Sequence, residues 1–398
     1  MNPRLHIDFV KRLGNVTLQM RFAVNTEILV LFGPSGAGKT QTLHAIAGLS
    51  TPDSGSITLD DTTFFQCVPG KPVVNLPARQ RRIGYVFQQY ALFPHMNALE
   101  NVVFPLAGRR DARDRAMELL ERMHLAHLAQ RMPHELSGGQ QQRVAIARAL
   151  ATEPRVLLFD ESFSALDRPI RERLHDEIRA LQAERRLIVV YVTHNLDDAL
   201  AVGHRLAVMR DGRIEQIGRI DDVFTYPANQ RVLNILGLPN AISARVVETG
   251  PSGALLDWDG ITLEAPPSGA APGAQVMAYI RPEDIRLIYP DRPLSRVVGN
   301  NHMDGVVVER RLGRHVHHLH VALPDGRQIE VVYPASSYAT MTLTPGERVR
   351  LALRKESIVV IAAHSGLPQT VEEPHRQGAN GADDGPARDP ALAPLPPP

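Results

Sequence analysis

The sequence predicts an α/β domain over residues 1–235, followed by a smaller all-β domain over residues 240–365. In the first part, short apolar runs alternate with amphipathic segments, which is the pattern of strands and helices in α/β proteins. After about Asn240 the pattern changes to short valine-rich runs separated by glycine, proline and aspartate turns, which is typical of an all-β fold. A chain of 398 residues is long enough for two or three such domains.

The apolar runs of the first domain are expected to form one sheet that is buried on both faces, because they are short and rich in valine, isoleucine and leucine. They cover residues 28–32, 82–87, 156–159, 187–192 and 206–209. Helices are expected over residues 113–125 and 171–185, where apolar residues recur at helical spacing. A further helix is expected from about Gln140, after a break at Pro133 and residues 137–139.

Composition excludes several classes of protein. The chain has 44 Lys and Arg against 43 Asp and Glu, and this net charge of +1 supplies no general field for binding nucleic acid. The single cysteine, Cys67, can form neither an intramolecular disulfide nor a multi-cysteine metal site, so a reducing compartment is expected. No uncharged apolar run approaches the ~20 residues that span a bilayer. We therefore expect a cytoplasmic protein that is neither exported nor membrane-spanning.

The clearest motif lies between the first apolar run and an expected helix at residues 41–49. It matches the phosphate-binding pattern G-x-x-x-x-G-K-[ST] and consists of Gly33, Pro34, Ser35, Gly36, Ala37, Gly38, Lys39 and Thr40. The glycines allow backbone N–H groups to surround phosphate oxygens, and the following helix adds its positive N-terminal end. Lys39 is expected to reach the β- and γ-phosphates, and the Thr40 hydroxyl can ligate Mg²⁺. The motif therefore predicts a site for ATP and Mg²⁺.

A pair of acidic residues, Asp160 and Glu161, follows the apolar run at residues 156–159. Such a strand delivers both carboxylates to the carboxyl edge of the sheet, where ligands of α/β domains bind. Asp160 is expected to hold Mg²⁺, and Glu161 to orient and deprotonate a water that attacks the γ-phosphate.

A third motif identifies a family. With Leu136-Ser137-Gly138-Gly139-Gln140, the sequence resembles the ATP-binding subunit of an ATP-binding cassette (ABC) transporter, whose signature is this pentapeptide. The resemblance extends to three further residues in family order, namely Gln88, Asp167 and His194.

The resemblance implies a P-loop cassette with a helical subdomain at about residues 89–150. It also implies that two cassettes pair head to tail, with each ATP between the phosphate loop of one chain and the Ser-Gly-Gly turn of the other. A turn that opens a helix is an anion site, so the chemistry agrees with this arrangement. Gln88 would then contact Mg²⁺ and the attacking water, and His194 would hold the γ-phosphate. Asp167 would transmit the state of one cassette to the other across the dimer.

The same resemblance implies partners and a location. Two such cassettes would serve two transmembrane permease subunits, with a substrate-binding protein acting through the permease. The chain would be a peripheral protein at the cytoplasmic face of the bacterial inner membrane.

Two positions depart from the family pattern. The residue after the catalytic glutamate is usually proline and here is Ser162, which leaves φ less fixed and restores a backbone N–H. The aromatic residue that stacks on adenine is replaced by Leu13, which predicts a weaker contact with the base and looser selectivity for adenine.

An internal repeat supports the all-β assignment of the second domain. Pro272-Gly273, Val276, Arg281, Glu283 and residues 285–288 are matched by Pro345-Gly346, Val349, Arg354, Glu356 and residues 358–361. The repeat predicts a duplicated, OB-like β unit and resembles the regulatory TOBE domain of oxyanion importers. Residues 366–398 are proline-rich and contain no aromatic residue, so they are expected to be disordered, with a proline-rich ligand at residues 395–398 as the alternative.

The transported solute can be argued only from resemblance. Residues 75–89 and 92–96 resemble the ATPase of molybdate importers, which makes molybdate or tungstate the first expectation and sulfate the second. Sugar, polyamine and iron importers remain open. An oxyanion in the second domain would be held by backbone N–H groups and polar side chains between the two β units, near Ser295, Asn300, Asn301, Ser336 and Ser337. The alternative is a domain that only supports pairing of the cassettes.

Two alternatives come from other classes of protein. A soluble ABC ATPase of DNA repair or translation would show a second cassette, a coiled-coil insertion or a basic face, and none is visible in the sequence. A metal-sensing module is suggested by His315, His317, His318 and His320. Because side chains alternate between the two faces of a strand, these histidines divide into two pairs, and an ordinary strand is the better interpretation.

Overall fold

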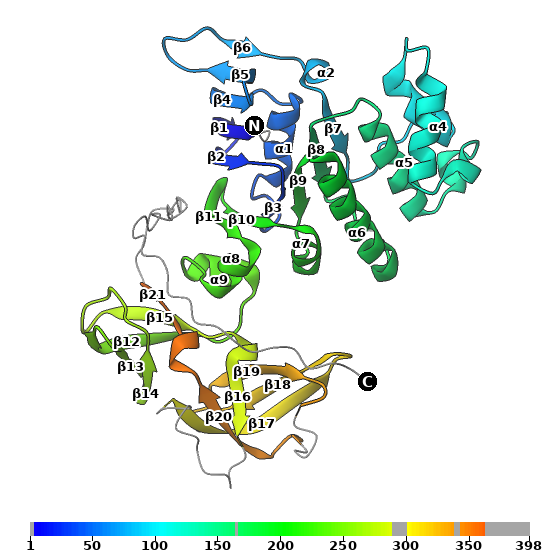
Figure 1. Ribbon diagram of the computed structural model, residues 1–398. Helices are drawn as coiled ribbons and strands as arrows, with labels where there is room; N and C mark the ends of the chain where they lie inside the picture. Colours follow the sequence, from blue (N-terminus) through cyan, green and yellow to red (C-terminus); the bar gives the residue numbers. More distant parts are fainter. Residues whose placement is uncertain (1–3, 164–165, 289–300, 338–342, 363–398) are drawn as a thin grey trace, which may run out of the picture.

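The computed structural model describes residues 4–163, 166–288, 301–337 and 343–362. It shows an α/β lobe followed by an all-β lobe (Figure 1), as the sequence predicts. The expected tail at residues 366–398 lies outside the described residues, as do Ser295 and Asn300.

The central sheet of the first lobe has six strands in the order β11-β10-β3-β9-β8-β7. Its strands are β3 (Ile28–Phe32), β7 (Ile83–Val86), β8 (Val156–Asp160), β9 (Ile188–Thr193), β10 (Arg205–Arg210) and β11 (Arg213–Arg219). All are parallel to their neighbours except β11, which lies antiparallel at the edge. Every residue of β3, β8 and β9 is buried, which confirms the prediction of a sheet covered on both faces.

One face of this sheet packs against α1 (Lys39–Ala47) and a second, antiparallel sheet (Figure 1). That sheet has the order β2-β1-β4-β5-β6 and consists of β1 (Leu5–Leu13), β2 (Val16–Val24), β4 (Ser54–Leu59), β5 (Thr62–Cys67) and β6 (Val74–Asn75). It was not predicted from the sequence, although the alternation of buried Leu5, Ile7 and Phe9 is a strand signal. Arg82, which the sequence analysis includes in the apolar run at residues 82–87, has a left-handed φ of 48° and lies between α2 (Ala78–Arg81) and β7.

The core on the other face includes buried residues of helices from the rest of the lobe. These helices are α3 (Ala98–Val103), α4 (Ala112–Arg122), α5 (Gly138–Leu150), α6 (Arg168–Arg185), α7 (Leu196–Val202), α8 (Ile220–Thr225) and α9 (Gln230–Leu236), with the 3₁₀ turns η1 (Phe104–Leu106), η2 (Ala126–Leu128) and η3 (Pro133–Glu135). Among them, α3 and α4 pack against each other and against α5.

Several helix ends differ from the sequence expectation. The α1 helix covers Lys39–Ala47, two residues earlier at each end than the expected residues 41–49. The α5 helix begins at Gly138 because Ser137 and Gln140 form a capping box. The α6 helix begins at Arg168, with a proline in its first turn, where proline is favourable. The α4 helix ends at Arg122, and His124 beyond it is left-handed with a φ of 57°.

The second lobe consists of two five-stranded sheets around one core. The first has the order β14-β13-β12-β15-β21 and the second β16-β20-β17-β18-β19. Their bounds are β12 (Ala241–Gly250), β13 (Gly253–Trp258), β14 (Ile261–Ala265), β15 (Gln275–Tyr279), β16 (Ile285–Ile288), β17 (His302–Leu312), β18 (Val316–Ala322), β19 (Gln328–Pro334), β20 (Arg348–Leu353) and β21 (Val359–Ala362).

The sequence repeat has a direct structural counterpart. The first copy forms β15, η4 (Pro282–Asp284) and β16, and the second forms β20, η6 (Lys355–Ser357) and β21. The first strand of each copy pairs with the second strand of the other, since β15 pairs with β21 and β16 with β20. Each of the two sheets therefore contains one strand from each copy, so both copies are needed to form them.

Candidate functional site

Strand register brings the sequence motifs to one edge of the central sheet. In the parallel ladder Phe32 pairs with Thr193, and Asp160 pairs with Val192. Val86 pairs with Phe159, one residue before the acidic pair. The phosphate loop, Glu161, His194 and Gln88 therefore all follow strands that end at the same edge, where α/β proteins bind their ligands.

The phosphate loop depends on glycine at three positions. Gly36 and Gly38 have φ angles of 83° and 97°, a conformation that residues with a side chain rarely adopt. A Cβ atom at Gly33 would lie 2.2 Å from the carbonyl oxygen of Met209, so no larger residue fits there. The loop then enters α1 directly after Gly38, which leaves the first N–H groups of the helix facing the loop.

Lys39 is a buried cation in the first turn of α1. Its side chain is 5% exposed, and its Nζ donates hydrogen bonds to the carbonyl oxygens of Gly33 (2.8 Å) and Pro34 (3.0 Å). Nζ lies 3.9 Å from Oε1 of Glu161. Burial lowers the pKa of Lys39, while the charges of Glu161 and Asp160 partly oppose that change. An anionic phosphate in the loop would supply the counter-charge that favours the ammonium form.

Asp160 is held by two hydroxyl groups. Thr40 Oγ1 donates to Asp160 Oδ1 at 2.7 Å, and the Tyr85 hydroxyl donates to Oδ2 at 3.0 Å. Thr40 and Asp160 are oxygen donors suited to a hard cation such as Mg²⁺, which binds one or two carboxylates together with phosphate oxygens. Within the described residues no cluster of three or more His, Cys, Asp or Glu side chains could hold a metal. A cation at Asp160 would therefore take no further ligand from these four residue types, which leaves Thr40, phosphate, water and the side chain of Gln88 as candidates.

Glu161 and His194 contact each other at the same edge. Nδ1 of His194 lies 3.1 Å from Oε2 of Glu161, and the Glu161 backbone N–H donates to the carbonyl of Val192. Glu161 has a left-handed φ of 45°, which is uncommon outside glycine and concentrates at functional sites. His194 is half exposed and lines a cavity of about 440 Å³ beside Gly33 and Pro34.

Three further residues of the sequence analysis lie around this site. Gln88 is exposed just beyond the end of β7. Ser162 is buried, and its hydroxyl has no hydrogen-bond partner among the residues that the structure describes. Leu13 ends β1 and packs against the core on the α1 side of the sheet.

The Ser-Gly-Gly turn lies on the helical side of the lobe, at the start of α5. Ser137 and Gly138 are exposed, while a Cβ atom at Gly139 would lie 2.8 Å from a methyl group of Ile170 on α6. Asp167 directly precedes α6, as its N-terminal flanking residue. In the described part of the chain, no hydrogen bond or ion pair joins this turn to residues 33–40.

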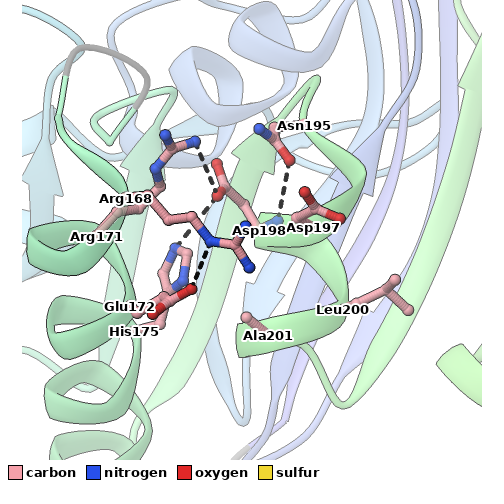
Figure 2. Close-up of a pocket in the computed structure, with 9 residues that line it drawn as sticks. All are labelled: Arg168, Arg171, Glu172, His175, Asn195, Asp197, Asp198, Leu200 and Ala201. Atoms are coloured by element: carbon pink, nitrogen blue, oxygen red, sulfur yellow. Dashed lines mark hydrogen bonds and ion pairs between the residues drawn. The ribbon is translucent and has the colours of Figure 1, made fainter. Parts of the chain in front are cut away.

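A buried charge cluster, which sequence reasoning missed, joins α6 to α7 beside a cavity of about 430 Å³ (Figure 2). Asp198 lies 3.4 Å from Arg171 and 3.8 Å from His175, and both distances end at Oδ1. Arg171 also donates to the carbonyl of Leu166, next to Asp167. Burial lowers the pKa of His175, which favours the neutral imidazole. The only signal for the cluster in the sequence is a charged residue at an inward position of each helix, Arg171 on α6 and Asp198 on α7.

Asp198 also connects this cluster to the loop that carries His194. Thr193 Oγ1 lies 3.4 Å from Asp198 Oδ2, and Asn195 caps α7 by accepting from the Asp198 backbone N–H. The loops of Asp167 and His194 are thus linked through one carboxylate.

Of the expected anion donors in the second lobe, the structure describes Asn301, Ser336 and Ser337. Asn301 accepts from the backbone N–H of Glu264 and donates to its carbonyl, so its amide fixes β14 and does not face an anion. Ser336 is exposed. On β18, Leu319 and Val321 are buried while His318 pairs with Glu330 at 2.7 Å, which agrees with the ordinary-strand interpretation of the histidines.

Fold and site together define a P-loop nucleotide-binding protein of the cassette type. Residues 15–164 match the family model of the ABC transporter, and residues 278–361 match that of the TOBE domain. The chain is 39% identical over 336 residues to the spermidine/putrescine import ATP-binding protein PotA of Nitrosospira multiformis, covering 82% of this chain and 89% of that protein. It is 42% identical over 284 residues to the Fe(3+) ions import ATP-binding protein FbpC of Brucella abortus, covering 70% and 78%.

The ATP-binding cassette MJ0796, solved as a dimer bound to ADP and Pi, is 34% identical with a TM-score of 0.46, covering 55% of this chain and 98% of that one. By its sequence relatives, the chain belongs to the import ATP-binding proteins of the ABC transporter family that carry a C-terminal TOBE domain. It is an ATPase of the import type, as the sequence motifs predict. The described residues contain no helix long and apolar enough to cross a bilayer.

Proposed function

We propose that two copies of this chain bind ATP between them and energise a membrane importer from the cytoplasmic face of the inner membrane. The observation that carries the proposal is the convergence of Lys39, Thr40, Asp160, Glu161 and His194 on one sheet edge. Two permease subunits and a substrate-binding protein would complete the transporter. The import function in the names of the relatives supports this assembly.

Each residue at this edge has a distinct proposed role. Lys39 and the loop N–H groups bind the phosphates, while Thr40 and Asp160 hold Mg²⁺. Mg²⁺, when bound, neutralises charge on the phosphate oxygens. Glu161 accepts the proton of the attacking water. His194, whose contact with Glu161 supports this role, would hold both that carboxylate and the γ-phosphate. Gln88 would join the site when its exposed loop moves toward the cation.

The second half of each ATP site comes, in this proposal, from the partner copy. Ser137, Gly138 and Gly139 open the 13-residue α5 helix, and backbone N–H groups at a helix start favour anions. Ser137 and Gly138 are exposed, and Gln140 holds Ser137 in place through the capping box. Asp167, at the neighbouring helix start, would contact the partner.

For the solute, we propose a polyamine such as spermidine or putrescine. The support is that relatives named for polyamine import match a long stretch of the chain, 82% of it in the Nitrosospira multiformis protein. Ferric iron is the second candidate, because the Brucella abortus relative is 42% identical. None of the relatives reported above is named for molybdate, tungstate, sulfate or a sugar, so these solutes follow polyamine and iron in our proposal.

The test is solute uptake in cells that lack the chromosomal copy of this chain but retain its permease and binding protein. Labelled spermidine, putrescine, ferric iron and molybdate are supplied in parallel, with Glu161→Gln as the matched control. We expect the native chain to restore polyamine uptake and Glu161→Gln to leave it absent. Restored uptake of iron or molybdate alone would reject the polyamine proposal. Full uptake with Glu161→Gln would contradict energisation by hydrolysis at this site.

A further inference from the structure

The Asp160 carboxylate has a hydroxyl partner on each of its oxygens. Thr40, which bonds Oδ1, belongs to the phosphate motif, but Tyr85, which bonds Oδ2, belongs to no motif with an assigned role. Asp160 is 6% exposed, so these contacts replace solvent at both oxygens. Tyr85 is therefore the side chain that fixes the position of Oδ2.

The Tyr85 ring is held from two directions. Its centroid lies 4.2 Å from that of Phe87, the residue that follows β7, and 6.0 Å from that of His44. His44 lies on α1, one helical turn after Thr40. Tyr85 therefore joins β7, α1 and β8 at the point where Asp160 leaves the sheet.

The physical consequence concerns rotation of the carboxylate. The terminal torsion of an aspartate is broad, so a carboxylate held at one oxygen can still turn about its last bond. A second hydrogen bond at Oδ2 fixes the plane and directs Oδ1 toward Thr40. Groups that orient a metal ligand in this way raise the affinity of the site for the metal.

We propose that Tyr85 is a positioning residue for Mg²⁺, which holds the Asp160 carboxylate so that Oδ1 and Thr40 face the cation together. This rests on the proposed Mg²⁺ role of Thr40 and Asp160. It is separable from a scaffold role, because β7 and β8 are already joined by four paired positions of the backbone ladder. A hydroxyl that only supported the fold would not change the response to Mg²⁺.

The experiment is a Mg²⁺ titration of binding to a fluorescent N-methylanthraniloyl ATP, with the full-length native chain and Tyr85→Phe. The substitution removes one oxygen and leaves the ring contacts in place. We expect Tyr85→Phe to need about tenfold more Mg²⁺ for half-maximal binding, at the low end of the range for groups that orient a metal ligand. Binding in EDTA should be unchanged. Tyr226→Phe, the same change at a tyrosine that is 62% exposed, is the matched control and should behave like the native chain.

Two results would overturn this inference alone. One is a Mg²⁺ requirement of Tyr85→Phe equal to that of Tyr226→Phe. The other is an equal loss of binding in EDTA and in Mg²⁺, which would mean that Tyr85 acts on the phosphate loop or the fold. A native chain that binds no nucleotide in either condition would overturn the proposed nucleotide site and the role of Tyr85 with it.

Discussion

Lys39 and Glu161 lie 3.9 Å apart, yet their proposed roles belong to different stages of the reaction. Lys39 binds phosphate charge before and during reaction, so Lys39→Ala should weaken ATP binding by about 10- to 100-fold, the range for a charge-assisted hydrogen bond. Glu161 acts on the water, so Glu161→Gln should bind ATP normally and lose about 10²- to 10⁴-fold in turnover. Equilibrium binding and steady-state hydrolysis by the purified chain measure both. Normal turnover by Glu161→Gln would reject the assignment of the base.

For individual residues, the sequence predicts which side chains lie close together when they belong to continuous motifs. Lys39 and Thr40 are adjacent in the phosphate motif, and parallel strands place Asp160 at the same edge, so their proximity could be predicted. Tyr85 could not be identified in this way. Its bond to Asp160 depends on the register of two strands that are distant in the sequence, and a tyrosine in a strand carries no specific signal.

At the scale of elements, the buried Asp198 joins α6 to α7 and ties together the loops of Asp167 and His194. Asp198→Asn removes the charge that faces Arg171 and should lower the free energy of unfolding by about 2 kcal/mol, less than a fully buried pair would lose because Arg171 is 21% exposed. Chemical denaturation compares it with Asp197→Asn, an exposed neighbour on the same helix that should change little. Equal stability of the two variants would show that the cluster does not hold the helices together.

Whether a strand or helix can be predicted from the sequence depends on how much of its surface is buried. The strands β3, β8 and β9 could be predicted to within a residue, because a short, continuous apolar run in an α/β chain indicates a strand covered on both faces. The antiparallel sheet of β1, β2, β4, β5 and β6 was not predicted, because β1 and β2 carry charged and polar residues on one face and so form no continuous apolar run. The start of α5 was placed too late because glycine is a poor helix former, whereas the Ser137 cap fixes the true start.

At the scale of the whole molecule, the β repeat was visible in the sequence, but the exchange of strands between its copies was not. The pairings β15 with β21 and β16 with β20 join segments far apart in the chain, and local sequence does not encode such partners. The proposed pairing of two cassettes is likewise a property that a single chain does not display. The exposed Ser137 turn, which has no hydrogen bond to residues 33–40 in the described part of its own chain, is the structural reason to expect a second copy.

The most direct measurement mixes two damaged variants, Lys39→Ala and Ser137→Glu, and follows ATP hydrolysis at an ATP concentration well below the one that saturates the native chain. Lys39→Ala weakens binding at the phosphate loop, and Ser137→Glu places a negative charge where the partner's phosphates would bind, so each variant alone should have little activity under this condition. In a mixed pair with two-fold symmetric interfaces, one of the two sites has both halves intact, so an equal mixture should recover about one quarter of native activity. Activity of the mixture no higher than that of the separate variants would contradict the proposal that each ATP site is built from two copies of this chain.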